Sequence, residues 1–125
     1  MPAYKPEDMH QLFVEAFNRK DEEALLSLYE TNATLVPQPG QPVMGVEAIR
    51  AALQGFLALN GKMSIETVYC IKAGDLALAR GHWRLTGGAG PNGEPVELQG
   101  NTVEVMRRQP DGGWRYAVDD PYGAD

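Results

Sequence analysis

The feature that most constrains the fold is a change in hydrophobic periodicity at Asn60-Gly61. Before this point, apolar residues recur every three or four positions, which is typical of helices that bury one face. After it, apolar and polar residues alternate, which is typical of strands in a sheet with one buried face. Helical and strand patterns therefore occupy separate parts of the chain, and this predicts an α+β fold rather than a βαβ repeat.

Three helices are predicted before the change. Pro6 is a favourable residue for opening the first helix, because its missing N–H would have no partner there. Asp21 is placed to cap a short second helix. The third helix is expected from Val46 to about Leu59, where Asn60-Gly61 ends it.

A proline-rich segment lies between the second and third helices. Residues 33–36 predict a short strand, which is followed by Pro37, Pro39 and Pro42. Proline fixes the backbone without a ladder hydrogen bond. Two compatible interpretations remain open here, the lip of a pocket and a stiff connection.

The second half predicts a four-stranded antiparallel meander. Its expected strands cover residues 63–72, 76–86, 96–108 and 114–119. Gly100 lies inside the third of these strands and predicts a bulge or bend. The three helices would cover the apolar face of this sheet.

Composition narrows the function classes. The 125 residues suit one domain, residues 1–125, and the net charge of −6 with scattered Lys and Arg argues against nucleic acid. We expect no membrane span, since no apolar run approaches about 20 residues. The N-terminus also lacks the apolar core of a signal peptide, so we expect a soluble cytoplasmic protein.

Cysteine and histidine usage gives no metal signal. Cys70 is the single cysteine, so no intramolecular disulfide is possible, and we interpret it as a buried strand thiol. His10 is expected to be exposed on the first helix. No further ligands at fixed spacing accompany His10 or His82, so we expect no metal.

Two segments resemble a known family: "LYETNATLVPQPGQPVMGVEAIRAAL" and "VEVMRRQPDGGWRYAVDDP". They are similar to the nuclear transport factor 2-like superfamily, and within it to the SnoaL-like and ketosteroid isomerase-like group of small bacterial proteins. The resemblance implies three helices packed on a curved antiparallel sheet that forms a cone-shaped barrel with a central cavity. It also implies a homodimer through the outer sheet face, which Val103 and Val105 on that face favour as well. We expect no cofactor.

The ketosteroid isomerase constellation is incomplete here. Such enzymes use an Asp base with a Tyr and a protonated carboxylic acid as the oxyanion pair. By resemblance, the base position is Pro37 and the oxyanion Tyr position is Phe13, neither of which can do that chemistry. A carboxyl is kept near Glu104 and a supporting Tyr at Tyr29, whereas a second supporting Tyr is replaced by Leu53. The chain is therefore not expected to be an authentic ketosteroid isomerase.

Strand parity suggests a replacement pair of carboxyls. If Glu104 faces the cavity, the same alignment turns Ala117 and Asp119 inward on the last strand. Two carboxyls in a dry pocket should separate in pKa and could act as acid and base, so Asp119 and Glu104 are the candidate catalytic residues. The expected ligand-binding residues are Tyr29, Trp83, Phe13, Phe56, Tyr69 and Met106.

Other readings of these carboxyls stay open. Glu104 could instead be a solvated outward residue, and Asp119 could cap a turn. A register slip at Gly100 would exchange the two faces. On the other face, Arg80, His82 and Arg84 should point outward, where they could pair with carboxylates of a second copy.

Three functions remain open at this level. The chain could be a cofactor-independent isomerase, cyclase or hydrolase-type enzyme for a small hydrophobic molecule. It could instead be a non-catalytic ligand-binding module, or a dimerisation unit whose cavity is filled by side chains. An open pocket of roughly 300 Å³ or more would separate the first two from the third.

Overall fold

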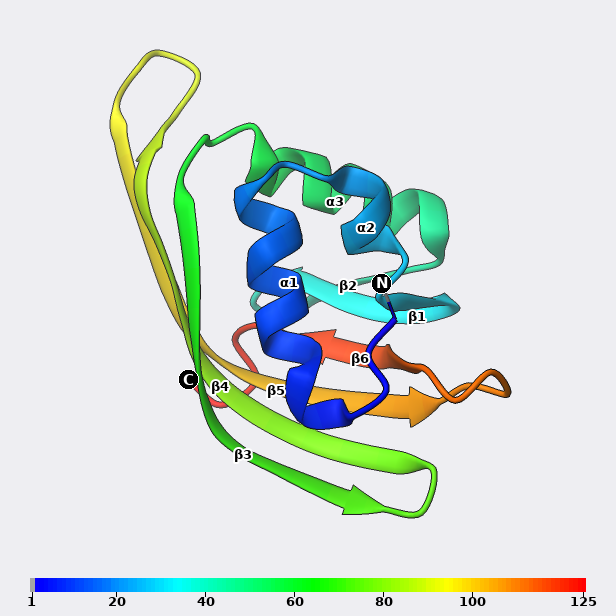
Figure 1. Ribbon diagram of the computed structural model, residues 1–125. Coiled ribbons are helices and arrows are strands. Elements are labelled where there is room, and N and C mark those ends of the chain that lie inside the picture. The colour runs from blue at the N-terminus through cyan, green and yellow to red at the C-terminus, as the bar shows by residue number, and fades with distance from the viewer. Residues whose placement is uncertain (1) are drawn as a thin grey trace.

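The computed structural model describes residues 2–125 (Figure 1). A single 3-10 turn, Pro6–Asp8, leads into α1, Met9–Asn18. The short α2, Glu22–Leu26, begins at the predicted cap, where the Asp21 carboxylate accepts a hydrogen bond from the Ala24 backbone N–H. Helix α3 covers Val46–Leu57. None of the helices within residues 2–125 is long and apolar enough to cross a membrane.

The strands form one curved, open sheet. Its order is β2-β1-β6-β5-β4-β3, and all neighbours are antiparallel except the parallel pair β1 and β6. The strand bounds are Tyr29–Gln38 (β1), Gln41–Met44 (β2), Lys62–Ala73 (β3), Leu76–Ala89 (β4), Pro95–Arg108 (β5) and Trp114–Asp120 (β6). The predicted meander is therefore present as β3 to β6. The sheet is a curved cone wall and not a closed barrel, because its edge strands β2 and β3 do not pair.

The proline-rich segment is a hairpin at the sheet edge. The expected short strand is longer than predicted, and β1 turns back into an additional strand, β2, at Gly40. Pro37 and Pro42 are tolerated because the β1–β2 ladder is irregular between Leu35 and Gln38 and β2 is an edge strand. The pocket described below is lined by Tyr29 and Leu35 of this hairpin and by none of its prolines. The prolines themselves are not part of the pocket wall, whereas Leu35 of the same segment is.

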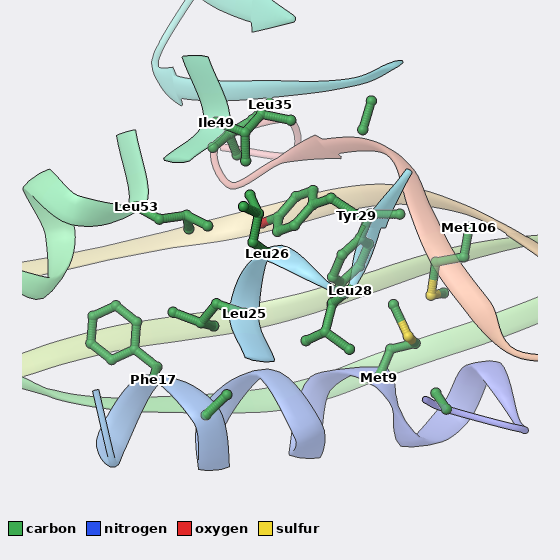
Figure 2. Packing of buried hydrophobic residues seen from close by; sticks show 14 of the residues in the cluster. Met9, Phe17, Leu25, Leu26, Leu28, Tyr29, Leu35, Ile49, Leu53 and Met106 are labelled. Carbon is green, nitrogen blue, oxygen red and sulfur yellow. The ribbon is translucent and has the colours of Figure 1, made fainter. Parts of the chain in front are cut away.

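The helices lie within the curve of the long strands, and the core fills the space between (Figure 1). Met9, Leu25, Ile49 and Leu53 are among the fully buried side chains. Figure 2 shows Leu53 and Phe17 at one end of this core and Met9 and Met106 at the other.

Gly100 is not a bulge. The β4–β5 register runs without a break through the pair Trp83 and Gly100, and the irregularity lies further along, between Leu85 and Gly88. A Cβ on Gly100 would lie 2.6 Å from the carbonyl oxygen of Pro121 and 2.7 Å from Nε1 of Trp83. Glycine is needed there because the indole occupies the space, and the Trp83 N–H donates to that carbonyl at 2.7 Å.

A bulge occurs instead in β6. Val118 pairs with Val105 and Tyr116 pairs with Met106, so Ala117 is the extra residue between them. The bulge changes the parity of the strand, and Tyr116 rather than Ala117 points into the core. The prediction that Ala117 faces inward is wrong, whereas Asp119 does lie inward because it follows the bulge.

Candidate functional site

A narrow pocket opens between the helices and the concave face of the sheet. Its lining consists of Phe13, Phe17, Tyr29, Leu35, Leu53, Phe56, Met63, Ile65, Trp83, Thr102, Glu104, Asp119 and Pro121. Its volume is about 40 Å³. Sites for drug-sized ligands begin at roughly 300 Å³. In this conformation, side chains therefore fill most of the cone.

Glu104 is one of two carboxyls in this apolar lining. It lies on β5 and is 2% exposed, so its expected inward orientation is present. Its Oε1 atom accepts from Nε2 of His10 at 2.5 Å and from the Thr102 hydroxyl at 2.9 Å. No group within residues 2–125 makes a hydrogen bond to Oε2. One carboxyl oxygen is thus fixed and the other is free for a ligand.

Asp119 has the same arrangement on the neighbouring strand. It pairs directly with Glu104 across the β5–β6 ladder, and its side chain is buried. Its Oδ2 atom accepts from the Tyr29 hydroxyl at 2.6 Å, and no hydrogen bond from the described residues reaches Oδ1. The outcome is a facing pair of carboxyls, each with one oxygen held by the protein.

The environments of the two carboxyls differ in charge. Burial and the negative charge of Glu104 raise the pKa of Asp119 to about 7, although the Tyr29 hydrogen bond and the charge of His10 act in the opposite direction. Asp119 therefore carries a proton in a large fraction of molecules at neutral pH. Because Oδ2 accepts from Tyr29, that proton belongs on Oδ1.

His10 is the residue that the sequence pattern placed wrongly. It was expected to be exposed, but it is 5% exposed and lies between Glu104 and Thr67, whose Oγ1 is 2.7 Å from Nδ1. Burial lowers the pKa of His10, but the hydrogen bond and charge of Glu104 outweigh it and raise that pKa overall. The ring fits because Gly81 lies beside it, where a Cβ would be 2.9 Å from Cε1 of His10.

Two expected ligand-binding residues lie outside the pocket. Tyr69 is 36% exposed and stacks against Arg80 at 5.8 Å, because a bulge between Thr67 and Tyr69 turns it to the outer face. Met106 is fully buried but belongs to the core end near Met9 and does not line the pocket (Figure 2). Tyr29, Trp83, Phe13 and Phe56 do line it, and Phe56 packs edge-on against Trp83.

Tyr116 is a second buried phenol near the pair. It is 1% exposed and packs against the ring of Tyr29 with centroids 5.2 Å apart. Its hydroxyl has no hydrogen-bond partner among the described residues. Burial, the negative charges of Glu104 and Asp119, and the closeness of its hydroxyl to the Glu104 carboxyl raise its pKa well above the ordinary value, so it stays neutral.

Metal-type clusters are not found within residues 2–125, where no group of three or more His, Cys, Asp or Glu side chains could hold an ion. Cys70 is half-buried rather than fully buried, and burial raises the pKa of its thiol. His82 and Arg84 lie on the outer face as expected, where His82 contacts Asn101 and Arg84.

The family is decided by a match to the SnoaL-like domain over residues 10–117. The chain belongs to the SnoaL-like family. Its fold is that of the nuclear transport factor 2-like superfamily, as the resemblance implied. No curated protein is similar enough to count as a match.

Solved structures similar to this SnoaL-like chain agree on the fold. A conserved protein from Planctomyces limnophilus is 23% identical with a TM-score of 0.78, over 91% of this chain and 89% of that one. A ketosteroid isomerase-like protein from Erwinia carotovora atroseptica is 21% identical with a TM-score of 0.71, over 91% and 89%. A putative dehydratase of the NTF2-like family from Streptomyces avermitilis is 21% identical with a TM-score of 0.69, over 93% of each chain. At these identities the likeness shows the fold alone.

Proposed function

We propose that this SnoaL-like protein is a cofactor-independent enzyme that moves a proton on a small, largely apolar molecule next to a carbonyl group. The observation that carries the proposal is the facing pair Glu104 and Asp119, each with one free oxygen in an apolar pocket. The raised pKa of Asp119 makes it an acid at neutral pH. The isomerase-like and dehydratase names of two similar structures support the same class of chemistry.

The proposed reaction is an enolisation. Glu104 Oε2 removes a proton from the carbon beside the carbonyl, and the C–H electrons form a carbon–carbon double bond. At the same time the carbonyl oxygen takes the proton from Asp119 Oδ1. In a substrate that already has a carbon–carbon double bond one carbon further from the carbonyl, the enol is a conjugated dienol. As Asp119 recovers the proton of the enol O–H, the carbonyl re-forms and the double bond shifts into conjugation with it. The far end of the dienol then takes the proton from Glu104, which restores both carboxyls and completes the isomerisation.

Substrate entry in this proposal requires side-chain movement, because the pocket is small as it stands. The half-buried apolar residues of the lining are Phe13, Phe56, Ile65 and Pro121, so they mark the side that faces solvent. Rotation of the two phenyl rings widens the pocket without breaking a hydrogen bond, since they make none.

A hydrogen–deuterium exchange assay tests the proposal without knowledge of the natural substrate. The protein is incubated in D₂O with a panel of small cyclic and aromatic ketones, and loss of the α-proton signal is followed by NMR. We expect faster exchange for at least one ketone, and a loss of roughly 10²-fold or more in Asp119→Asn. The control is Glu97→Gln, an exposed carboxyl on β5 outside the pocket lining, which should keep the rate.

The second candidate is a domain without catalysis. A pocket of about 40 Å³, far below roughly 300 Å³, favours a dimerisation unit whose cavity is filled by side chains over a ligand-binding module. Exchange at the buffer rate for every ketone would contradict the enzyme proposal. In that case, native mass spectrometry of the freshly purified protein would test for a retained apolar molecule, which a binding module should carry.

We also propose that a second copy of the chain covers the outer sheet face. Ile71, Leu78, Val105 and Val118 are consecutive cross-strand neighbours there and form an apolar row across β3 to β6. Ile71 is 57% exposed and Val118 is 39% exposed. The buried Nε of Arg80 on this face has no hydrogen-bond partner within residues 2–125, while Glu66 opposes His82 and is exposed. The face thus offers apolar area and both signs of charge, which suits a two-fold contact.

Light scattering after size exclusion tests this contact. The unsubstituted chain should have the mass of a dimer, and Ile71→Glu or Leu78→Glu should have the mass of a monomer. The control Ala51→Glu, on the exposed side of α3, should remain a dimer. A monomeric unsubstituted chain would contradict the proposal.

A further inference from the structure

The position of His10 sets the two carboxyls apart. Its imidazole is 2.5 Å from Glu104 Oε1, whereas Asp119 receives only the neutral hydroxyl of Tyr29. The two carboxyls are otherwise alike, since both are buried, both line the pocket and they face each other across the ladder. A cation beside one of them therefore decides where a shared proton is held.

The ring of His10 is held from both ends. Nε2 donates to Glu104, and Nδ1 is 2.7 Å from the hydroxyl oxygen of Thr67 on β3. When both nitrogens are protonated, both donate, and Thr67 accepts with its oxygen. Gly81, directly opposite Thr67 in the β3–β4 ladder, leaves the space that the ring fills. Four elements of the fold, α1, β3, β4 and β5, thus fix this one side chain.

We propose that His10 is a positioning residue that assigns the roles of the carboxyls, keeping Glu104 ionised as the base and leaving the exchangeable proton on Asp119 as the acid. This inference rests on the proposed function for its catalytic meaning, but its physical content is independent of any substrate. The imidazolium of His10 and the carboxylate of Glu104 form a buried ion pair. Glu104 Oε2 then keeps a free lone pair for a C–H proton, opposite the O–H of Asp119.

The other titratable groups around the pair leave this assignment intact. Tyr29 and Tyr116 have pKa values raised well above the ordinary value by burial, and burial also raises the pKa of Cys70, so all three are neutral near pH 6. Asp120 contributes a negative charge that acts on Asp119 and favours its protonated form. Glu7 acts on Cys70 from outside the pair.

Carbon-13 NMR of the side-chain carboxyls tests which group holds the proton. The protein is labelled at Asp Cγ and Glu Cδ, and the two signals are assigned by their loss in Asp119→Asn and Glu104→Gln. In the unsubstituted protein at pH 6, we expect a protonated Asp119 and an ionised Glu104. In His10→Gln, which keeps an amide donor but no charge, we expect Glu104 to take up most of the proton. Protonation of Glu104 removes the negative charge that raises the pKa of Asp119, and this outweighs the direct loss of the His10 charge, so the midpoint of Asp119 should fall by a pH unit or more.

Two further variants separate this role from a purely structural one. Valine has the shape of threonine but no hydroxyl, so Thr67→Val removes the acceptor of His10 Nδ1 and should move part of the proton from Asp119 to Glu104. This variant keeps the test informative if His10→Gln does not fold. Met9→Val perturbs the adjacent buried position of α1 without touching the pair, and Asp119 should stay protonated.

The results distinguish failure of this inference from failure of the proposed function. If His10→Gln and Thr67→Val both leave the proton on Asp119 with an unchanged midpoint, the inference is overturned while the acid–base pair survives. If Asp119 is an ordinary ionised carboxylate in the unsubstituted protein, the proposed function fails as well.

Discussion

At the scale of single residues, two buried tyrosines lie beside the carboxyl pair and differ in what their hydroxyls contact. Tyr29 donates to Asp119 at 2.6 Å, whereas the hydroxyl of Tyr116 has no partner within the described residues. Removing one partner of a buried hydrogen bond lowers the free energy of unfolding by more than the bond itself contributes, because the remaining partner stays buried away from water. The two phenols therefore form a matched pair for measuring what the Asp119 contact contributes.

We predict that Tyr29→Phe lowers the free energy of unfolding by about 1–3 kcal/mol, because it leaves Asp119 Oδ2 buried without a donor. The same change should raise the pKa of Asp119 further, since the Tyr29 hydrogen bond lowers it. Tyr116→Phe should be neutral or slightly stabilising. Urea unfolding of both variants measures the difference, and equal losses would show that the Tyr29 contact is not special.

Strand parity placed Glu104 and Asp119 on the inner face, and both are buried there. For Asp119 the reasoning was incomplete, because a bulge at Ala117 precedes it in β6. His10 was missed because its burial depends on the gap left by Gly81 on a strand 71 positions later in the chain. A glycine in a strand was the available signal, since it often marks a close approach of another group. The predicted orientations of Tyr69 and Ala117 were wrong because each strand contains one bulge. A bulge reverses the face of the sheet to which the residues after it point.

At the scale of elements, the site depends on how closely β4, β5 and the chain after β6 approach. Gly100 allows Trp83 to lie across β5 and to donate to Pro121, and both Trp83 and Pro121 line the pocket. The order of helices and strands could be read from periodicity, and the bounds of β3 to β6 followed closely. Strand β2 and the full length of β1 could not be read from periodicity, because the prolines in this segment predict a loop rather than a hairpin.

We predict that Gly100→Ala lowers the free energy of unfolding by roughly 2 kcal/mol or more, because the new Cβ meets a backbone carbonyl that has no room to move aside. Its control is Gly55→Ala in α3, where a Cβ meets nothing within 4 Å. That variant should gain about 0.5–1 kcal/mol from helix propensity. Thermal or urea unfolding compares them, and a harmless Gly100→Ala would contradict the packing described here.

At the scale of the whole molecule, the helices cover the concave face of an open sheet. Between them lies a pocket of about 40 Å³, whose lining includes the buried carboxyls of Glu104 and Asp119. Neither the strand order nor the parallel pairing of β1 with β6 can be deduced from periodicity, since both depend on which edges meet after folding. The family resemblance supplied the shape. The pocket volume depends on side-chain packing, which no pattern of residue types determines.

The buried carboxyl should make stability depend on pH. The pKa of Asp119 is raised from 3.8 to about 7, so the folded state binds this proton more tightly than the unfolded chain. The free energy of unfolding therefore falls as pH rises between these two values. The raised pKa of His10 acts in the same direction, because its contribution is present below its unfolded pKa and lost above its folded one. We predict a loss on the order of 2 kcal/mol between pH 5 and pH 8. Urea unfolding at several pH values measures it, and Asp119→Asn should flatten the profile.

The most direct measurement is the titration of Asp119 itself in the unsubstituted protein. The carboxyl carbon is labelled, assigned by its absence in Asp119→Asn, and followed by NMR from pH 4 to pH 9. The account predicts a midpoint near pH 7, at which this carboxyl serves as an acid opposite the free oxygen of Glu104. A midpoint near 4, the ordinary value for aspartate, would contradict it and leave the pocket without an acid–base pair.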